Sequence, residues 1–202
     1  MKQATGRTNP AANTQRMTIR LASDGHSCRF DLSLAARADE IVATVSSAQT
    51  QLVPAEMFDP ERSAAYLELA GMAARPSQTV VTSDPAADIV AIMAVESSVL
   101  ECLGEKIREK IRFTSPLLHT PAVARSVLWL EADSSLLYIK VYDAEGRLQL
   151  AEVFTAAGED ELLYYLTRLK DIHGTETILL AADTPKPVGR LVHEHFRKVL
   201  CE

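Results

Sequence analysis

The chain has 202 residues, of which 47% are hydrophobic and 24% charged, a composition typical of a globular protein with one or two domains. Its net charge of −6 is uneven: residues 1–23 contain four basic residues and no acidic one, whereas the rest contains 17 basic and 27 acidic residues. A body with this acidic excess offers little attraction to nucleic acid or to an anionic membrane, so the charge argues against both classes of partner.

Three cysteines, Cys28, Cys102 and Cys201, are widely spaced and odd in number, so they suggest neither a disulfide framework nor a metal-binding pair. No apolar run approaches the roughly 20 residues needed to span a bilayer. Residues 1–16 contain no Leu, Ile, Val or Phe, and therefore lack the apolar core of a signal peptide. We expect a cytoplasmic protein without membrane insertion, with residues 1–16 as a disordered tail.

Residues 17–125 alternate strand and helix signals. Residues 17–33 predict two strands around the turn Ser23-Asp24-Gly25, and residues 40–47 predict a third. Further signals follow in order: a helix that starts at Asp59-Pro60-Glu61 and ends at Gly71, strand-like runs at 78–82 and 88–95, a helix over residues 97–110, and a short helical connection from Ser115-Pro116.

Residues 126–154 carry the clearest pattern in the chain. Residues 127–130, 137–142 and 148–153 predict three antiparallel strands, separated by turns at Asp133-Ser134-Ser135 and at residues 143–146. The strict alternation of apolar and polar side chains at 137–142 is the pattern of a half-buried strand.

The remaining residues predict a helix, a strand and a second helix. Three carboxylates at 159–161 suit the first turn of a helix, and Gly174 suits its end. Residues 177–182 are an apolar strand, and a final helix follows with Asp183 or Thr184 as its N-cap. The order β-β-β-α-β-α is that of a ribonuclease-H-like unit, the building block of actin-like proteins.

A second such unit is predicted upstream. Aligning Asp24 on Asp133 gives another β-β-β start 109 residues earlier, although few residues are identical. The fold class predicted is therefore α/β, a duplicated ribonuclease-H-like (actin-like ATPase) fold. It consists of two lobes, residues 17–125 and 126–202, each with a mixed sheet flanked by helices.

The chain resembles a family of Bacteroidetes proteins that is defined only as a domain of unknown function. The resemblance covers residues 17–200 and is carried by TIRLASDGHSCRF at 18–30, QLVPAEMFDPERSAAYL at 51–67, FTSPLLHT at 113–120 and GEDELLYYL at 158–166. It implies an actin-like ATPase fold in a bacterial protein without an established activity. Bacterial proteins of that fold include scaffolds of cell division and pilus assembly, which is an analogy of fold alone.

An actin-like fold directs attention to a nucleotide site at two turns. Such proteins cradle phosphates with backbone N–H groups where side chains are small, and an Asp there organises Mg²⁺. The candidate binding residues are Asp24, Gly25, His26 and Ser27 in the first turn and Asp133, Ser134 and Ser135 in the second. The second turn has no glycine, and AADTPKPVG after Leu180 lacks the Gly-Gly pair expected near the adenosine. These departures indicate a degenerate site.

We therefore expect a non-catalytic scaffold or adaptor that works with a protein partner or by self-association, with no catalytic residues, no metal and no required cofactor. One alternative is an active switch that binds ATP and Mg²⁺. A second is a ribonuclease-H-like metal-dependent phosphodiesterase, in which Asp133, Glu159 or Glu161, and Asp183 would hold two metal ions. Helix-capping roles explain the same carboxylates, and the acidic body offers no basic track for a phosphate backbone.

Overall fold

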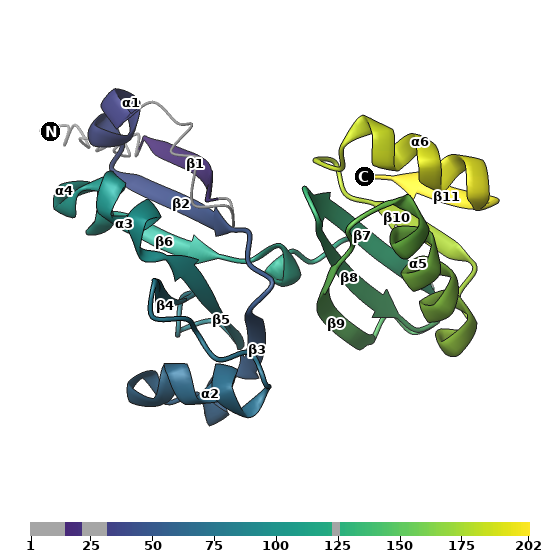
Figure 1. Cartoon of the computed structure of the whole chain (residues 1–202), viewed down its shortest axis with the longest axis horizontal. Helices are drawn as coiled ribbons and strands as arrows, with labels where there is room; N and C mark the ends of the chain where they lie inside the picture. Colours follow the sequence, from purple (N-terminus) through teal and green to yellow (C-terminus); the bar gives the residue numbers. More distant parts are fainter. Residues whose placement is uncertain (1–14, 22–31, 123–125) are drawn as a thin grey trace, which may run out of the picture.

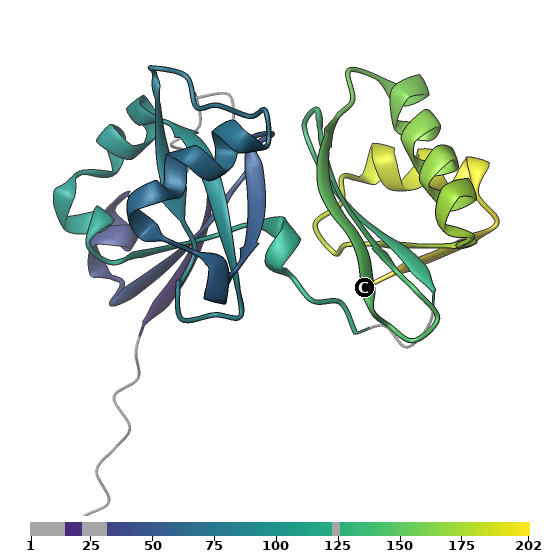
Figure 2. The same cartoon turned by 90° about the horizontal axis from the view of Figure 1, so that it is seen from below.

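The computed structural model describes residues 15–21, 32–122 and 126–202. Two β-sheets lie in residues 15–122, here called the N-terminal part, and one lies in residues 126–202, the C-terminal part (Figure 1). The two parts lie side by side, and the chain passes between them through η3 (Pro116–Leu118) (Figure 2).

The first sheet is parallel, with strand order β1-β2-β6, and its core is formed by residues such as Ile19, Ile41 and Leu100. The strands come from three separate stretches of chain because helices and the second sheet intervene. Its elements are β1 (Arg16–Leu21), α1 (Leu32–Arg37), β2 (Glu40–Val45), α3 (Ser97–Leu103), α4 (Glu105–Arg108) and β6 (Ile111–Thr114).

The second sheet is antiparallel, with order β3-β5-β4, and is inserted between β2 and β6. The Asp59 side chain accepts a hydrogen bond from the Glu61 N–H at 3.0 Å and so starts the helical segment as predicted, and Gly71 follows the helix at φ +73°. The elements are β3 (Thr50–Pro54), η1 (Ala55–Met57), η2 (Pro60–Arg62), α2 (Ser63–Leu69), β4 (Gln78–Thr82) and β5 (Ile89–Glu96).

The C-terminal part is a five-stranded mixed sheet with order β11-β10-β7-β8-β9. The meander, the helix ending at Gly174 (φ +63°) and the apolar strand are confirmed. The sequence did not indicate the last strand, which pairs with β10 in parallel. The elements are β7 (Val127–Asp133), β8 (Leu136–Tyr142), β9 (Leu148–Thr155), α5 (Glu159–His173), β10 (Thr177–Leu180), α6 (Lys186–His195) and β11 (Lys198–Cys201).

The two faces of this sheet are covered by different partners. Helices α5 and α6 pack on one face, around Leu166 and Val192. The opposite face turns toward the N-terminal part (Figure 2), where Trp129 and Tyr138 pack with Leu117 of η3. Every residue of β8 is consequently buried, and the prediction of a half-buried strand at 137–142 is wrong.

The predicted β-β-β start of the N-terminal part is not what the described residues form. Strands β1 and β2 exist, but they pair directly and in parallel, so β2 is not the third strand of an antiparallel meander. Helix α1 occupies the end of the stretch expected to be the second strand. The rest of that stretch, residues 22–31, lies outside the described residues. A duplication of the C-terminal unit therefore remains a prediction.

Three smaller expectations also need correction. The helix predicted over 97–110 breaks at Gly104 (φ +70°), and β6 follows it. Neither Asp183 nor Thr184 caps α6, since the Thr184 hydroxyl donates to the Leu130 carbonyl oxygen at 3.3 Å. Cys102 is disulfide-bonded, so the expectation that the cysteines form no disulfide is wrong. None of the helices in the described part of the chain has the length and apolar character needed to cross a bilayer.

Lys140 anchors the connection between the parts. Its side chain projects from β8 toward η3, is only 1% exposed, and donates hydrogen bonds to the carbonyl oxygens of Leu117 (3.5 Å) and His119. The ammonium lies 4.2 Å from the centroid of the Trp129 ring. Burial lowers the pKa of Lys140 to about 8, although the charges of Glu202 and Glu131 oppose this shift.

This lowered pKa predicts a rise in stability at alkaline pH. Between pH 8 and 10.5 the unfolded chain keeps the lysine proton that the folded chain has released, so folding is favoured as pH increases. From pH 7.5 to 9.5, we expect the free energy of unfolding to rise by roughly 2 kcal/mol more in the wild type than in Lys140→Met. Urea denaturation at both pH values measures this difference, and parallel pH profiles of the two proteins would contradict it.

Candidate functional site

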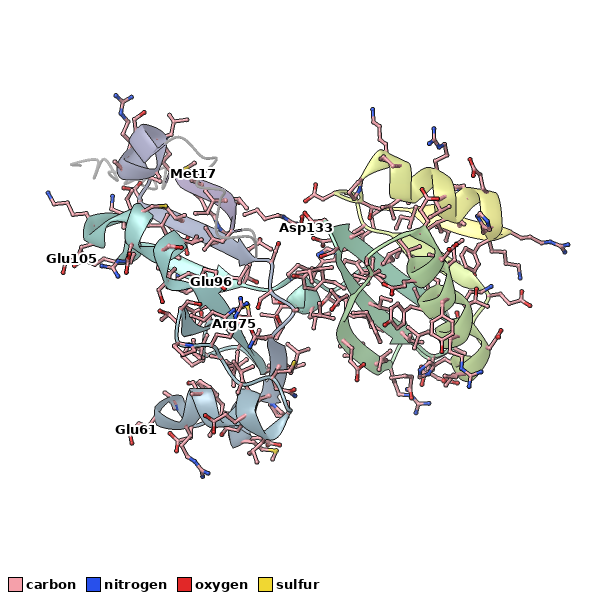
Figure 3. All side chains as sticks on the ribbon, in the orientation of Figure 1. Met17, Glu61, Arg75, Glu96, Glu105 and Asp133 are labelled. Atoms are coloured by element: carbon pink, nitrogen blue, oxygen red, sulfur yellow. The ribbon has the colours of Figure 1, made fainter. Side chains whose placement is uncertain are left out.

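A cluster of charged side chains joins the two parts where β1 and β7 approach their C-terminal ends. The Arg20 guanidinium lies 2.5 Å from a Glu131 carboxylate oxygen, 3.4 Å from Asp133 and 3.7 Å from Asp183. The Ser46 hydroxyl donates a hydrogen bond to the same Asp133 oxygen that faces Arg20. Asp133 lies on the edge of the C-terminal part nearest the N-terminal part (Figure 3). We call these five residues the Arg20 cluster.

Strand periodicity explains how these groups come together. Glu131 and Asp133 are two residues apart on β7, so both side chains project from the same face of the sheet. On β1, Ile19 and Leu21 point into the core of the first sheet, and Arg20 between them points the other way, toward the C-terminal part. The cluster therefore forms where one face of the parallel sheet contacts one face of the five-stranded sheet.

The cluster has an excess of negative charge, with one guanidinium against three carboxylates. Burial by itself lowers the pKa of Arg20, but the hydrogen bond and charge of Glu131, with Asp133, outweigh it and leave the pKa raised. Nearby, the Ser47 N–H donates to the Tyr138 hydroxyl at 2.8 Å, and burial raises the pKa of Tyr138 well above its ordinary value. Both groups therefore stay protonated at physiological pH.

The structure places only some of the predicted nucleotide-binding residues. Asp24, Gly25, His26 and Ser27 lie outside the described residues. Asp133 belongs to the Arg20 cluster. Ser134 and Ser135 form the two-residue loop between β7 and β8, and Asp133 and Leu136 pair at the base of this loop. Both serines line a separate hollow of about 350 Å³ beside Gly158 and Val188.

The carboxylates considered for a two-metal site do not gather. Asp133 and Asp183 both lie near Arg20, whereas Glu159 lines the hollow beside Ser134, and Glu161 accepts a hydrogen bond from the Ala157 N–H at 2.6 Å. In residues 15–21, 32–122 and 126–202, no three His, Cys, Asp or Glu side chains are arranged to hold a metal ion.

Sequence reasoning missed three members of the Arg20 cluster: Arg20, Ser46 and Glu131. A signal was available for two of them. Arg20 interrupts the apolar run MTIRLA, and Glu131 interrupts VLWLEA. A lone charge inside an apolar strand needs a partner of opposite sign when the strand is buried, so the two residues were candidates for one another.

Comparison with protein families assigns the chain to a family. A model described as "Protein of unknown function (DUF3822)" matches residues 31–170, and the chain therefore belongs to the DUF3822 family. The predicted resemblance to a family of unknown function is confirmed. The chain has no match among curated protein sequences.

A solved structure supports the actin-like ATPase part of the predicted fold class, whereas the duplication into two lobes remains a prediction. A Bacteroides thetaiotaomicron protein with an actin-like ATPase fold and unknown function superposes with a TM-score of 0.67 at 16% identity, over 94% of this chain and 91% of that chain. This similarity shows the fold and leaves the activity open.

Two further structures are more distant. The PilM-PilN type IV pilus biogenesis complex gives a TM-score of 0.44 at 13% identity, over 82% of this chain and 70% of that chain. The cytoplasmic domain of EpsL, from the type II secretion system of Vibrio cholerae, gives 0.41 at 11% identity, over 83% and 80%.

Removing the Arg20 guanidinium should destabilise the protein. Arg20→Met leaves the Glu131 carboxylate, in a residue only 7% exposed, without its cation, and we expect the free energy of unfolding to fall by about 2–3 kcal/mol. Arg147→Met removes an exposed ion pair with Asp143 and should cost less than about 1 kcal/mol. Chemical denaturation compares the variants, and equal losses would show that Arg20 is not needed to compensate the buried Glu131 carboxylate.

Ser134 adopts φ +55°, the left-handed region that disfavours a Cβ. Ser134→Gly should therefore raise the free energy of unfolding by roughly 0.5–1 kcal/mol, because glycine adopts this conformation without strain. Ser135→Gly is the matched control, since its φ is not positive and glycine there gives no such gain. Urea midpoints measure both, and a gain in Ser135→Gly equal to that in Ser134→Gly would contradict the turn geometry.

Proposed function

We propose that this member of the DUF3822 family is a non-catalytic scaffold or adaptor, built as two actin-like lobes whose nucleotide site is degenerate. The observation that carries the proposal is the position of Arg20. In an active site of this kind the carboxylate at the end of β7 would be free to organise Mg²⁺, whereas Asp133 accepts hydrogen bonds from Arg20 and Ser46.

Electrostatics supports the proposal of a degenerate nucleotide site. A magnesium ion bound at Asp133 would have to replace the guanidinium that compensates the buried Glu131 carboxylate. A triphosphate alone would meet three carboxylates against one guanidinium, and like charges repel it. The Arg20 cluster therefore favours an interlobe contact over a nucleotide cradle.

The turn between β7 and β8 supports it further. Phosphate is held by backbone N–H groups that side chains do not obstruct, and both loop positions here carry a serine side chain. With its acidic body the protein is not expected to bind nucleic acid, and its partners are another protein or a second copy of itself.

The direct test is a nucleotide titration of the full chain. We expect no saturable heat of binding for ATP or ADP with Mg²⁺ up to millimolar concentration in isothermal titration calorimetry, and a change in melting temperature below about 1 °C. Titration of Mg²⁺ without nucleotide is the control for general ionic effects.

Saturable one-to-one binding would overturn the degenerate site and favour the alternative of a Mg-ATP switch. In that case Asp24→Ala should weaken binding more than Asp133→Ala, because only the first turn has a glycine in its sequence.

A further inference from the structure

Strand β11 is an exposed edge of the five-stranded sheet. It pairs with β10 on one side, and no described strand lies along its other side. The opposite edge, β9, lies beside β3 of the N-terminal part, whereas β11 lies on the side of the sheet away from β9 (Figure 1). Three of the four residues of β11 are exposed, and among them Leu200 is 39% exposed. An exposed strand edge of this kind can pair with another strand.

The backbone of β11 limits how such a pair could form. The Glu202 N–H donates a hydrogen bond to the Leu180 carbonyl oxygen of β10 at 3.0 Å. Backbone groups alternate in direction along a strand, so those of Leu200 and Glu202 face β10 and those of Val199 and Cys201 face outward. In an antiparallel pair of two β11 strands, residues with outward-facing backbone groups must lie opposite one another. Registers centred on Val199, Leu200 or Cys201 meet this condition.

The side chains distinguish the three registers. Leu200 is in register with Leu179, whose side chain is buried on the face that turns toward the N-terminal part, so Lys198, Leu200 and Glu202 project from that face. A register centred on Leu200 places Lys198 of each copy opposite Glu202 of the other, and the two Leu200 side chains against each other. The other two registers place either Lys198 or Glu202 opposite Leu200. Charge complementarity therefore favours the register centred on Leu200.

The two charged residues already have partners within the chain, but these contacts lie at the surface. The Lys198 ammonium pairs with Glu176, and both side chains are exposed. The Glu202 carboxylate lies 2.9 Å from Nε2 of His119, whose side chain is half exposed. Each carboxylate and ammonium can therefore gain a facing charge without becoming buried and unpaired.

We propose that two copies of the chain associate through β11, antiparallel about a two-fold axis at Leu200, so that their five-stranded sheets join into one. This inference rests on the proposed scaffold role and deepens it by naming a surface for self-association. The interface is isologous, because the pattern Lys198-Leu200-Glu202 on one face is complementary to its own reverse. Since a four-residue strand buries little surface, we expect a weak dimer with a dissociation constant of roughly 0.1 mM.

Sedimentation velocity of the full chain between about 0.01 and 1 mM tests the association. We expect a shift from monomer to dimer, weakened at least about 10-fold by Lys198→Glu, which faces Glu202 of the other copy. Adding Glu202→Lys to Lys198→Glu restores opposite charges across the axis and should bring the dissociation constant back to within about 3-fold of the wild type. Lys106→Glu, at an exposed position of α4, makes the same charge change as Lys198→Glu and should have no effect.

Three outcomes would overturn the proposal. The first is a wild type that stays monomeric at the highest concentration. The second is equal weakening by Lys198→Glu and Lys106→Glu, which would show an effect of net charge alone. The third is a double variant that associates no better than Lys198→Glu.

Cross-linking tests the register. In a Cys201→Ser background, Leu200→Cys should form a disulfide-linked dimer on mild oxidation, because facing residues of a pair without mutual hydrogen bonds have Cα atoms about 4.5 Å apart, within disulfide range. Val199→Cys in the same background is the matched control and should not cross-link, since Val199 faces position 201. Equal cross-linking of the two variants would contradict the register. Nucleotide titration concerns the Arg20 cluster, so failure of the dimer and failure of the degenerate site are distinguishable.

Discussion

The pairing of Arg20 with Glu131 is the constraint on which the relation between the two parts depends. Either charge alone, at the end of a mostly apolar strand, would require its own solvation or a change of protonation. Together they compensate each other across 111 residues of sequence and bring the ends of β1 and β7 into one cluster. A contact of this kind specifies one relative position of the two parts, because the partly exposed guanidinium satisfies Glu131 and Asp133 at the same time.

The contact between the two parts also determines which face of the C-terminal sheet is buried. In an isolated unit, the face of β8 that carries Tyr138, Lys140 and Tyr142 would be the solvent face. Here this face receives η3 and the neighbouring segments of the N-terminal part, so that Tyr138 and Lys140 become buried and their polar atoms find partners on Ser47 and on the carbonyls of η3 and His119. Buried polar groups with satisfied hydrogen bonds hold the interface in one arrangement better than apolar contact alone, which tolerates sliding.

The Arg20 cluster and the hollow beside β3 and β9 lie at two places along one contact between the parts. Arg20 bridges the parts at the first place. At the second, Leu52 of β3 and Ala151 and Val153 of β9 pack against the same group of buried residues. As proposed, the Arg20 cluster occupies the place of a nucleotide site, so a scaffold built on an actin-like fold would use this contact for structure.

By itself, the sequence determined the elements whose signals are local. Helix α5 was predicted because its carboxylates, its leucine spacing and Gly174 all act within one helix, and the β7–β8–β9 meander because its turns are short. The structure alone decided what depends on distant pairing. The four-residue strands β6 and β11 are stabilised by the strands beside them, and the alternation of β8 does not reveal that its polar face will be covered. Glu131 stands out in the sequence as a candidate partner of Arg20, but only the docking of the two parts shows that Arg20 meets Glu131 and Asp133 together. The alternation of side chains along a strand shows which face of the sheet each residue occupies. What covers that face is determined only when the two parts pack together.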